Sequence, residues 1–399
     1  MSDRGKLTTI ASGINSSGQV VGHSLNTLVG NNRAFLYSDG TMIDLGSFGA
    51  VRSVANGIND AGQVAATSQN SSVDARAIVW SNGTATDLGT LGGSVAVAID
   101  INNSGQVTGQ STTVDGDGHA FLFSEGTMID LGTLGGVSSQ GRGINSSGQV
   151  VGSSPTATIL HHAFLYSDGT MTDLGTLGGT LSVAHAINDS GHVVGSSRTA
   201  IANGADNAFL WIDGVMTDLG TLPGVIGSVA HDISNSGEEI VGSTQGGVGD
   251  GLNHAMIWLD GTAFDLNTLL VSIDAGWTLE VATGINDSGQ IAAWGRHSLG
   301  AFHAFLLTTP VKPVTIDVKP GTEPDCGGAV PVAILGSDTL DVTQIDPTTL
   351  SYEGLDVRQR NNGSLFCRVK DVNGDGYDDF QCHYQDVITY GMLTGELLD

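Results

Sequence analysis

The stretch of this chain with the most specific chemistry is DVNGDGYDD, residues 371–379. Its spacing, D-x-N-x-D-G-x-x-D, provides oxygen donors at alternate positions, and Ca²⁺ binds about six to eight oxygens in such loops, with a glycine at the sharp turn. Without a cation, the three ligand carboxylates, among four aspartates in these nine residues, would repel one another. The pattern therefore predicts a Ca²⁺ site whose ligands are Asp371, Asn373, Asp375, the carbonyl oxygen of Tyr377, and Asp379.

Two cysteines flank this loop. Cys382 occupies the twelfth position, where an EF-hand has a bidentate glutamate, so we expect a calcium loop on a β-hairpin instead of a helix-loop-helix. Cys367 lies on the opposite side, and cysteines facing each other across a hairpin can meet the Cα separation that a disulfide requires. We therefore expect a Cys367–Cys382 disulfide and a free Cys326. The alternative for the loop is an Asp- and Gly-rich turn without metal.

A second group of candidate residues surrounds the segment NTLLVSIDAGWTLEVATGIN, which holds Trp277 and Glu280. Asp250, Arg296 and His297 belong to loops that we expect to lie nearby. An exposed tryptophan beside a carboxylate suits sugar binding, because the ring stacks on the sugar while the polar group bonds its hydroxyls. These five residues are our candidate ligand site. The alternative is that Trp277 fills a gap between structural repeats.

The elements that must position these residues are set by a repeat that covers the first three quarters of the chain. Seven segments of the type GINSSGQVVG are each followed by one such as HAFLYSDG, and six then continue into DLG or DLN. Each unit contains four short strands bounded by Gly, Asn, Asp and Ser turn signals. The anchor residues, spaced 43 to 52 residues apart, are Asn15, Asn59, Asn102, Asn145, Asn188, Ser234 and Asn286.

Four strands in about 43 residues is the size of a propeller blade. We therefore predict an all-β protein, with a seven-bladed β-propeller over residues 1–309, a linker at 310–313 and a small β-sandwich-like domain at 314–399. The alternative architecture is a β-solenoid. Because the seventh unit lacks its DLG strand, we expect residues 5–10 to complete that blade and close the ring.

Most repeated polar residues have structural explanations. The anchor Asn caps a tight turn, and the Gly three residues later supplies a positive φ. The Arg, His or Asn before AF and the Asp of DLG would bond adjacent strands. Three residues before the anchor, Arg142, His185 and His231 could form a polar group near the channel. The loops that vary in length all lie at one end of the blades, which makes that end our candidate binding face.

Composition excludes several functions. The chain has 41 acidic residues, 14 Lys plus Arg and a net charge of −27, so we expect neither nucleic acid nor an anionic membrane as partner. No apolar run is long enough for membrane insertion. The sequence contains no GxSxG, HExxH, SxxK, phosphate-loop or CxxC motif. A composition rich in Gly, Ser, Thr and Asn is typical of secreted bacterial repeat proteins.

The combined signature GINxxGQVVG…HAFLYSDGxMxDLGTLGG resembles the HAF-type extracellular repeat family, named for the HAF at His119, His162 and His303. The resemblance implies secretion and a repeat propeller, but no defined activity. The run PVAILGSD…DVTQIDP…DVNGDG is similar to a β-module at the ends of secreted bacterial proteins. We expect an extracellular or cell-surface, monomeric, non-catalytic protein that binds polysaccharide or a protein partner. The alternative is a polysaccharide lyase or glycoside hydrolase with its site on the variable-loop face.

Overall fold

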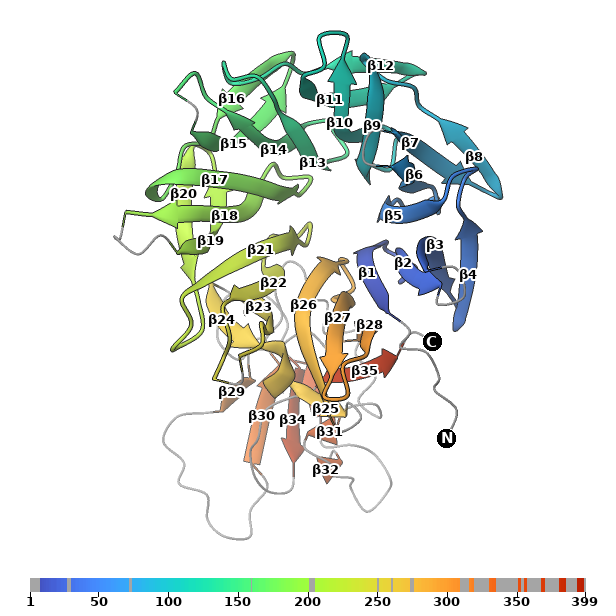
Figure 1. Ribbon diagram of the computed structural model, residues 1–399. Coiled ribbons are helices and arrows are strands. Elements are labelled where there is room, and N and C mark those ends of the chain that lie inside the picture. The colour runs from blue at the N-terminus through green and yellow to red at the C-terminus, as the bar shows by residue number, and fades with distance from the viewer. Residues whose placement is uncertain are drawn as a thin grey trace. The chain divides into compact units, whose positions relative to one another are not determined.

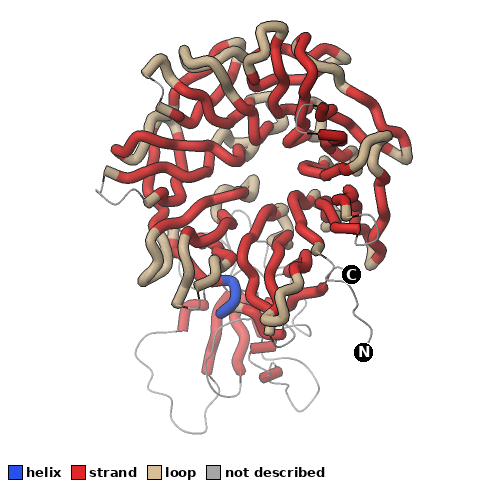
Figure 2. The backbone as a smooth tube through the Cα atoms, viewed as in Figure 1, coloured by secondary structure: helices blue, strands red, loops and turns tan. Residues whose placement is uncertain are grey.

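The computed structural model describes residues 8–308, apart from 27–29, 72–73, 159, 201–204, 250, 260 and 273–275. Beyond residue 308 it describes the strand segments 316–318, 330–334, 351–352, 355–356, 367–369, 380–384 and 393–397. Strands dominate these residues, and the helical element among them is one 3-10 turn, η1 (Leu266–Thr268) (Figure 2). The prediction of an all-β fold is confirmed.

The described strands of the first unit form seven antiparallel blades arranged in a ring, of which the fourth and fifth are joined by a single parallel pairing between His161 and Leu181 (Figure 1). The innermost strands are β1 (Thr9–Ile14), β5 (Arg52–Ile58), β9 (Gly92–Ile101), β13 (Gln140–Ile144), β17 (Gly178–Ile187), β21 (Gly227–Ile233) and β26 (Trp277–Ile285). The second strands are β2 (Val20–Asn26), β6 (Val64–Ser71), β10 (Val107–Thr113), β14 (Val150–Pro155), β18 (Val193–Thr199), β22 (Glu239–Gln245) and β27 (Ile291–His297).

The outer half of each sheet holds the third and fourth strands. The third strands are β3 (Asn31–Ser38), β7 (Asp74–Ser81), β11 (Gly118–Ser124), β15 (His161–Ser167), β19 (Asp206–Ile212), β23 (Ala255–Leu259) and β28 (Phe302–Thr308). The fourth strands of the first six sheets are β4 (Thr41–Gly46), β8 (Thr84–Asp87), β12 (Thr127–Asp130), β16 (Thr170–Asp173), β20 (Val215–Gly220) and β24 (Thr262–Asp265). Each of the first six blades is thus a four-stranded meander, as expected for a propeller.

The seventh blade is completed from the opposite end of the chain to the one we expected. β35 (Leu393–Leu397) pairs antiparallel with β28, with Leu307 opposite Gly395, and the short β25 (Leu270–Ser272) extends the sheet beyond it. Thr9 and Ile10, which we assigned to the closing strand, instead begin β1 and pair with β2. The prediction that residues 5–10 provide the fourth strand is therefore wrong.

The core lies between neighbouring blades. The alanine of each AF-type segment is fully buried in all seven blades, because any larger side chain there would push adjacent sheets apart. The next residue is a large buried side chain, such as Phe121 or Phe164 at 0% exposure. Phe121 of the third blade packs against Ala65 and Ala77 of the second. This alternation of small and large residues holds the sheets together face to face.

The repeated turn and strut residues act as predicted. Asn15 Oδ1 accepts the backbone N–H groups of Ser17 and Gln19 at 3.1 and 2.9 Å, and the turn glycines of all seven repeats have φ between 72° and 82°. The struts join the third and fourth strands of six blades, through Arg33–Asp44, Arg76–Asp87, His119–Asp130, His162–Asp173, Asn207–Asp218 and His254–Asp265. The histidines of these pairs are therefore structural.

The chain forms two compact units, one of Met1–Thr308 with Thr394–Asp399 and one of Thr309–Leu393. The second unit is an insertion between the third and fourth strands of the seventh blade, so the last six residues do not belong to it as we had expected. Its described strands are β29 (Ile316–Val318), β30 (Val330–Ile334), β31 (Ser351–Tyr352), β32 (Leu355–Asp356), β33 (Cys367–Val369) and β34 (Phe380–Tyr384). They form a four-stranded sheet in the order β29-β30-β34-β33 and a separate β31-β32 hairpin.

Candidate binding site at the centre of the propeller

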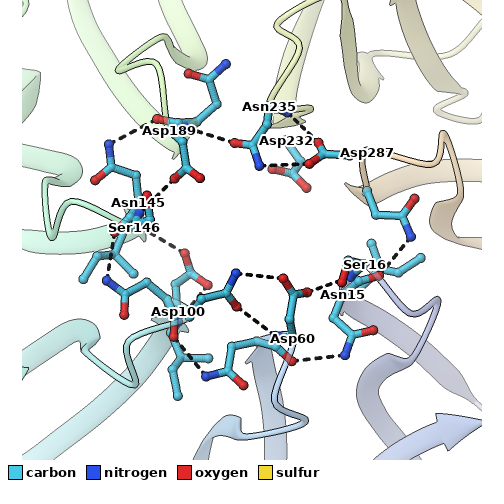
Figure 3. A pocket seen from close by; sticks show the side chains of 18 of the residues that line it. Asn15, Ser16, Asp60, Asp100, Asn145, Ser146, Asp189, Asp232, Asn235 and Asp287 are labelled. Atoms are coloured by element: carbon cyan, nitrogen blue, oxygen red, sulfur yellow. Dashed lines mark hydrogen bonds between the residues drawn. The ribbon is translucent and has the colours of Figure 1, made fainter. Parts of the chain in front are cut away.

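A cavity of about 210 Å³ lies at the centre of the ring, at the turns that join the first and second strands (Figure 3). Each of the seven repeats contributes an isoleucine and the residue that follows its anchor, and all but the sixth also contribute the anchor itself. We call this cavity the central cup and define it by its rim residues, which are Ser16, Asp60, Asn103, Ser146, Asp189, Asn235 and Asp287. All seven rim residues are exposed.

The anchor residues form a belt below the rim. Asn15 Nδ2 donates to the carbonyl oxygen of Asn59 in the next blade at 3.1 Å, and the same bond recurs from Asn59, Asn102, Asn145 and Asn188. Asn286 donates to Asn15 at 2.9 Å, which closes the ring between the last blade and the first. Ser234 replaces the asparagine in the sixth blade. The repeated Asn thus caps its own turn and also joins adjacent blades.

The rim residues make a second set of contacts between blades. Backbone N–H groups donate to the rim side chain of the following blade wherever that side chain is Asp or Asn, as from Ser16 to Asp60 at 2.9 Å and from Ser146 to Asp189 at 2.9 Å. Burial alone would raise the pKa of Asp60, but hydrogen bonds from Ser16 and Asn103 outweigh it and lower that pKa. Asp60 therefore stays ionised on the rim.

Two further carboxylates lie deeper in the cup. Asp100 accepts the N–H groups of Ile101 and of Ile144 in the next blade, at 2.8 and 3.0 Å. Asp232 bonds Ile233 and Ile285 of the next blade in the same way, both at 2.9 Å. At this position the other blades have glycine or alanine, namely Gly13, Gly57, Gly143, Ala186 and Gly284.

Burial raises the pKa of both carboxyls, against the effect of these hydrogen bonds. The pKa of Asp100 rises to about 6. The pKa of Asp232 rises to about 7, and the charges of Asp100 and Asp287 add to the effect of burial. The cup therefore gains negative charge as the pH rises through neutrality. Within the described part of the chain, no three His, Cys, Asp or Glu side chains converge as metal ligands would.

The structure places four of the five sequence-predicted ligand residues together on β26 and β27. The Trp277 ring lies 5.0 Å from those of His297 and His303 and 5.3 Å from that of Phe305, all in edge-to-face contact. Glu280 is 5% exposed and forms an ion pair of 2.7 Å with Arg296.

These contacts fix the indole and the carboxylate within the seventh blade. These aromatic partners all lie on strands of the blade that contains Trp277, so the alternative in which Trp277 fills a gap between structural repeats stays a prediction. Asp250, the fifth predicted ligand residue, lies outside the described residues.

The predicted calcium loop at 371–379 also lies outside the described residues. The two strands that flank it, β33 and β34, pair antiparallel. Their register places Cys367 directly opposite Cys382, which is the arrangement that the predicted disulfide requires.

Sequence reasoning missed the central cup. We expected binding at the variable loops, whereas the cup is built from the turns of nearly constant length at the other end of the blades. Two signals were present in the sequence. The residue after every anchor is Ser, Asp or Asn, and Asp100 and Asp232 interrupt a position that otherwise holds glycine or alanine.

Comparisons with known proteins support the fold. No protein-family model matches the chain, and no curated protein matches its sequence. Among solved structures, the β-propeller domain of the Trilobed protease from Pyrococcus furiosus matches with a TM-score of 0.51 at 9% identity, over 75% of this chain and 93% of that domain. A puromycin-hydrolysing peptidase from Mycobacterium tuberculosis matches with a TM-score of 0.50 at 10% identity, over 83% of this chain and 58% of the peptidase.

TolB from Acinetobacter baumannii matches with a TM-score of 0.43 at 13% identity, and the chain spans 62% of its length. At these identities the likeness extends to the fold alone. The first unit of this chain is a β-propeller.

Proposed function

We propose that this chain is a non-catalytic binding propeller of the extracellular space or cell surface, which holds a polysaccharide or a protein partner through its central cup. The observation that carries the proposal is the lining of the cup. All seven repeats present exposed Ser, Asn or Asp side chains around one cavity of about 210 Å³. Concave sites with a few convergent polar groups on a rigid scaffold are the usual form of a ligand site. The HAF-type repeat signature supports the extracellular location.

The chemistry of the rim narrows the ligand. Carboxylate and amide oxygens accept hydrogen bonds from sugar hydroxyls and from protonated amines. The three rim carboxylates, Asp60, Asp189 and Asp287, repel anionic groups, and so does the net charge of −27. We therefore expect the cup to prefer neutral polysaccharides or polymers of amino sugars over uronic acid polymers.

A pull-down with neutral, amino-sugar and uronic polysaccharides tests this function and its location. Ser146→Tyr fills the cup from an exposed rim position, and we expect it to abolish binding. Trp277→Ala is the matched variant for the variable-loop end and should leave binding unchanged. If Trp277→Ala loses binding and Ser146→Tyr retains it, the ligand site lies at the five residues predicted from the sequence and not at the cup. No binding in the whole panel would contradict the polysaccharide proposal, and products released from a uronic polymer would establish the lyase alternative.

We further propose a structural Ca²⁺ site in the second unit. Asp371, Asn373, Asp375, Asp379 and the Tyr377 carbonyl are all hard oxygen donors, as calcium requires. The pairing of β33 with β34 on either side of these residues supports a hairpin loop.

A further inference from the structure

The innermost strand of every blade contains a β-bulge at the same place. In β13, for example, the register with β14 shifts between Gly141 and Gly143, which leaves Arg142 as the extra residue. A bulge turns a side chain away from the regular alternation of the strand and recurs next to functional sites. The seven bulge residues are Ser12, Asn56, Ile99, Arg142, His185, His231 and Thr283.

Three consecutive blades bring basic side chains together at this level. The rings of His185 and His231 lie 5.5 Å apart in edge-to-face contact. The His231 Nε2 atom lies 3.2 Å from Ser243 Oγ. Burial lowers the pKa of both histidines, and the nearby charge of Arg142 lowers each further. Arg142 and the two imidazoles are therefore one cluster, in which the imidazoles are neutral at pH 7 and can each donate a hydrogen bond.

The charge of Arg142 has no counter-ion among the described residues. No carboxylate among them lies within 4.0 Å of its guanidinium, and its Nε atom is buried without a hydrogen-bond partner. Burial also lowers the pKa of Arg142. The carboxylates of Asp100 and Asp232 are already bonded to backbone N–H groups. A half-buried cation without a partner is destabilising, because part of its hydration is lost and no opposite charge replaces it.

We propose that Arg142, His185 and His231 form a binding site for a small oxyanion, such as a sulfate or a carboxylate. The planar guanidinium matches two oxygens of such a group, and the imidazole N–H groups supply further donors. A bound oxyanion supplies the missing negative charge, which explains why an arginine with a buried Nε atom is tolerated here. The site is separate from the rim of the cup, which favours ligands of the opposite charge, and it does not depend on the function proposed above.

Calorimetric titration of the full chain with sodium sulfate and sodium acetate, at constant ionic strength, tests the site. We expect saturable binding of at least one anion, weakened by at least about tenfold in Arg142→Gln, because charge-assisted hydrogen bonds are lost. Arg52→Gln removes an exposed arginine of β5 and is the matched control. A short oligouronate, added as a third arm, distinguishes a free anion from a carboxylate carried on a polymer. No saturable binding in any arm, or equal binding by Arg142→Gln, overturns the proposal.

A second measurement separates ligand binding from a structural role of Arg142. Without an oxyanion, Arg142→Gln removes an unpaired, half-buried charge, so its propeller should unfold at a higher temperature than that of the unmodified chain. Added sulfate should stabilise the unmodified chain by mass action and leave the variant unchanged. If Arg142→Gln is less stable in the absence of anion, Arg142 has a structural partner and the anion site is wrong.

Discussion

At the scale of single residues, polar side chains join neighbouring strands of a blade, and their type can change between blades as long as the side chain can still donate a hydrogen bond. The residue before AF is Arg, His or Asn, yet Arg33, His119 and Asn207 each reach the Asp of their own fourth strand. A donor of any of these lengths satisfies the carboxylate, so variation between blades costs little. The position held by Asp100 and Asp232 differs, because five blades have no polar side chain there at all.

This difference leads to a prediction on pH. A carboxyl whose pKa is higher in the folded than in the unfolded state binds its proton more tightly when folded. The pKa of Asp100 is raised to about 6 and that of Asp232 to about 7, from 3.8, so the contribution of these two carboxyls to the free energy of unfolding should fall as the pH rises between about 4 and 7. The lowered pKa values of His185 and His231 contribute with the opposite sign over this range. The double variant Asp100→Ala/Asp232→Ala should lose this contribution, which is on the order of a few kcal/mol in total, so its free energy of unfolding should rise more with pH than that of the unmodified chain.

Urea-induced unfolding of the propeller at about pH 4.5 and about pH 8 measures the difference. The exposed loop residue Asp115 provides the control, since Asp115→Ala should retain the slope of the unmodified chain. An unchanged slope in the double variant would show that the two carboxyls titrate normally.

The same residues show what sequence could and could not predict at this scale. The roles of Asn15 and Gly18 within their own turn followed from local backbone chemistry, and the structure confirms them. The bond from Asn15 to the next blade joins residues 44 positions apart. Local propensities say nothing about such a contact, because it exists only once the blades are placed around a ring.

At the scale of elements, the number and order of strands were predictable because each blade repeats the same turn signals. The closing strand was not, since its pairing partner is far away in sequence. Residues 393–397, LTGEL, follow directly on the second unit and were assigned to it, whereas they pair with β28. At the other terminus Thr8 forms an isolated parallel bridge to Phe302, so the predicted neighbourhood was correct but the strand assignment was wrong.

Removal of β35 tests this closure. Deletion of residues 394–399 should lower the unfolding temperature of the propeller by several degrees, because it leaves β28 with unpaired backbone groups. An unpaired edge also promotes association between chains, so light scattering should rise on heating. Deletion of residues 398–399, which lie beyond the strand, is the matched control. Equal unfolding temperatures for the two deletions would show that β35 adds nothing to the seventh blade.

At the scale of the whole molecule, the second unit is covalently part of the seventh blade. The chain leaves the propeller after Thr308 and returns at Thr394, so the last strand can pair only after a loop of about eighty residues has closed. A folded insertion holds its two ends in place and so reduces the entropy cost of closing that loop. The stability of the insertion therefore contributes to that of the propeller through the closure of this loop.

Calcium binding should reveal this coupling. Mass action predicts that Ca²⁺ at about a hundred times its Kd raises the stability of the second unit by about 2.7 kcal/mol. Scanning calorimetry with Ca²⁺ and with a chelator should show the larger shift in the transition of the second unit and a smaller shift in that of the propeller.

Asp375→Ala should abolish both shifts, because it removes a central oxygen ligand. Deletion of residues 394–399 should abolish the propeller shift alone. If Ca²⁺ shifts neither transition and titration detects no bound ion, the calcium site does not exist. If the deletion variant keeps the Ca²⁺-induced shift of the propeller transition, the coupling does not pass through β35.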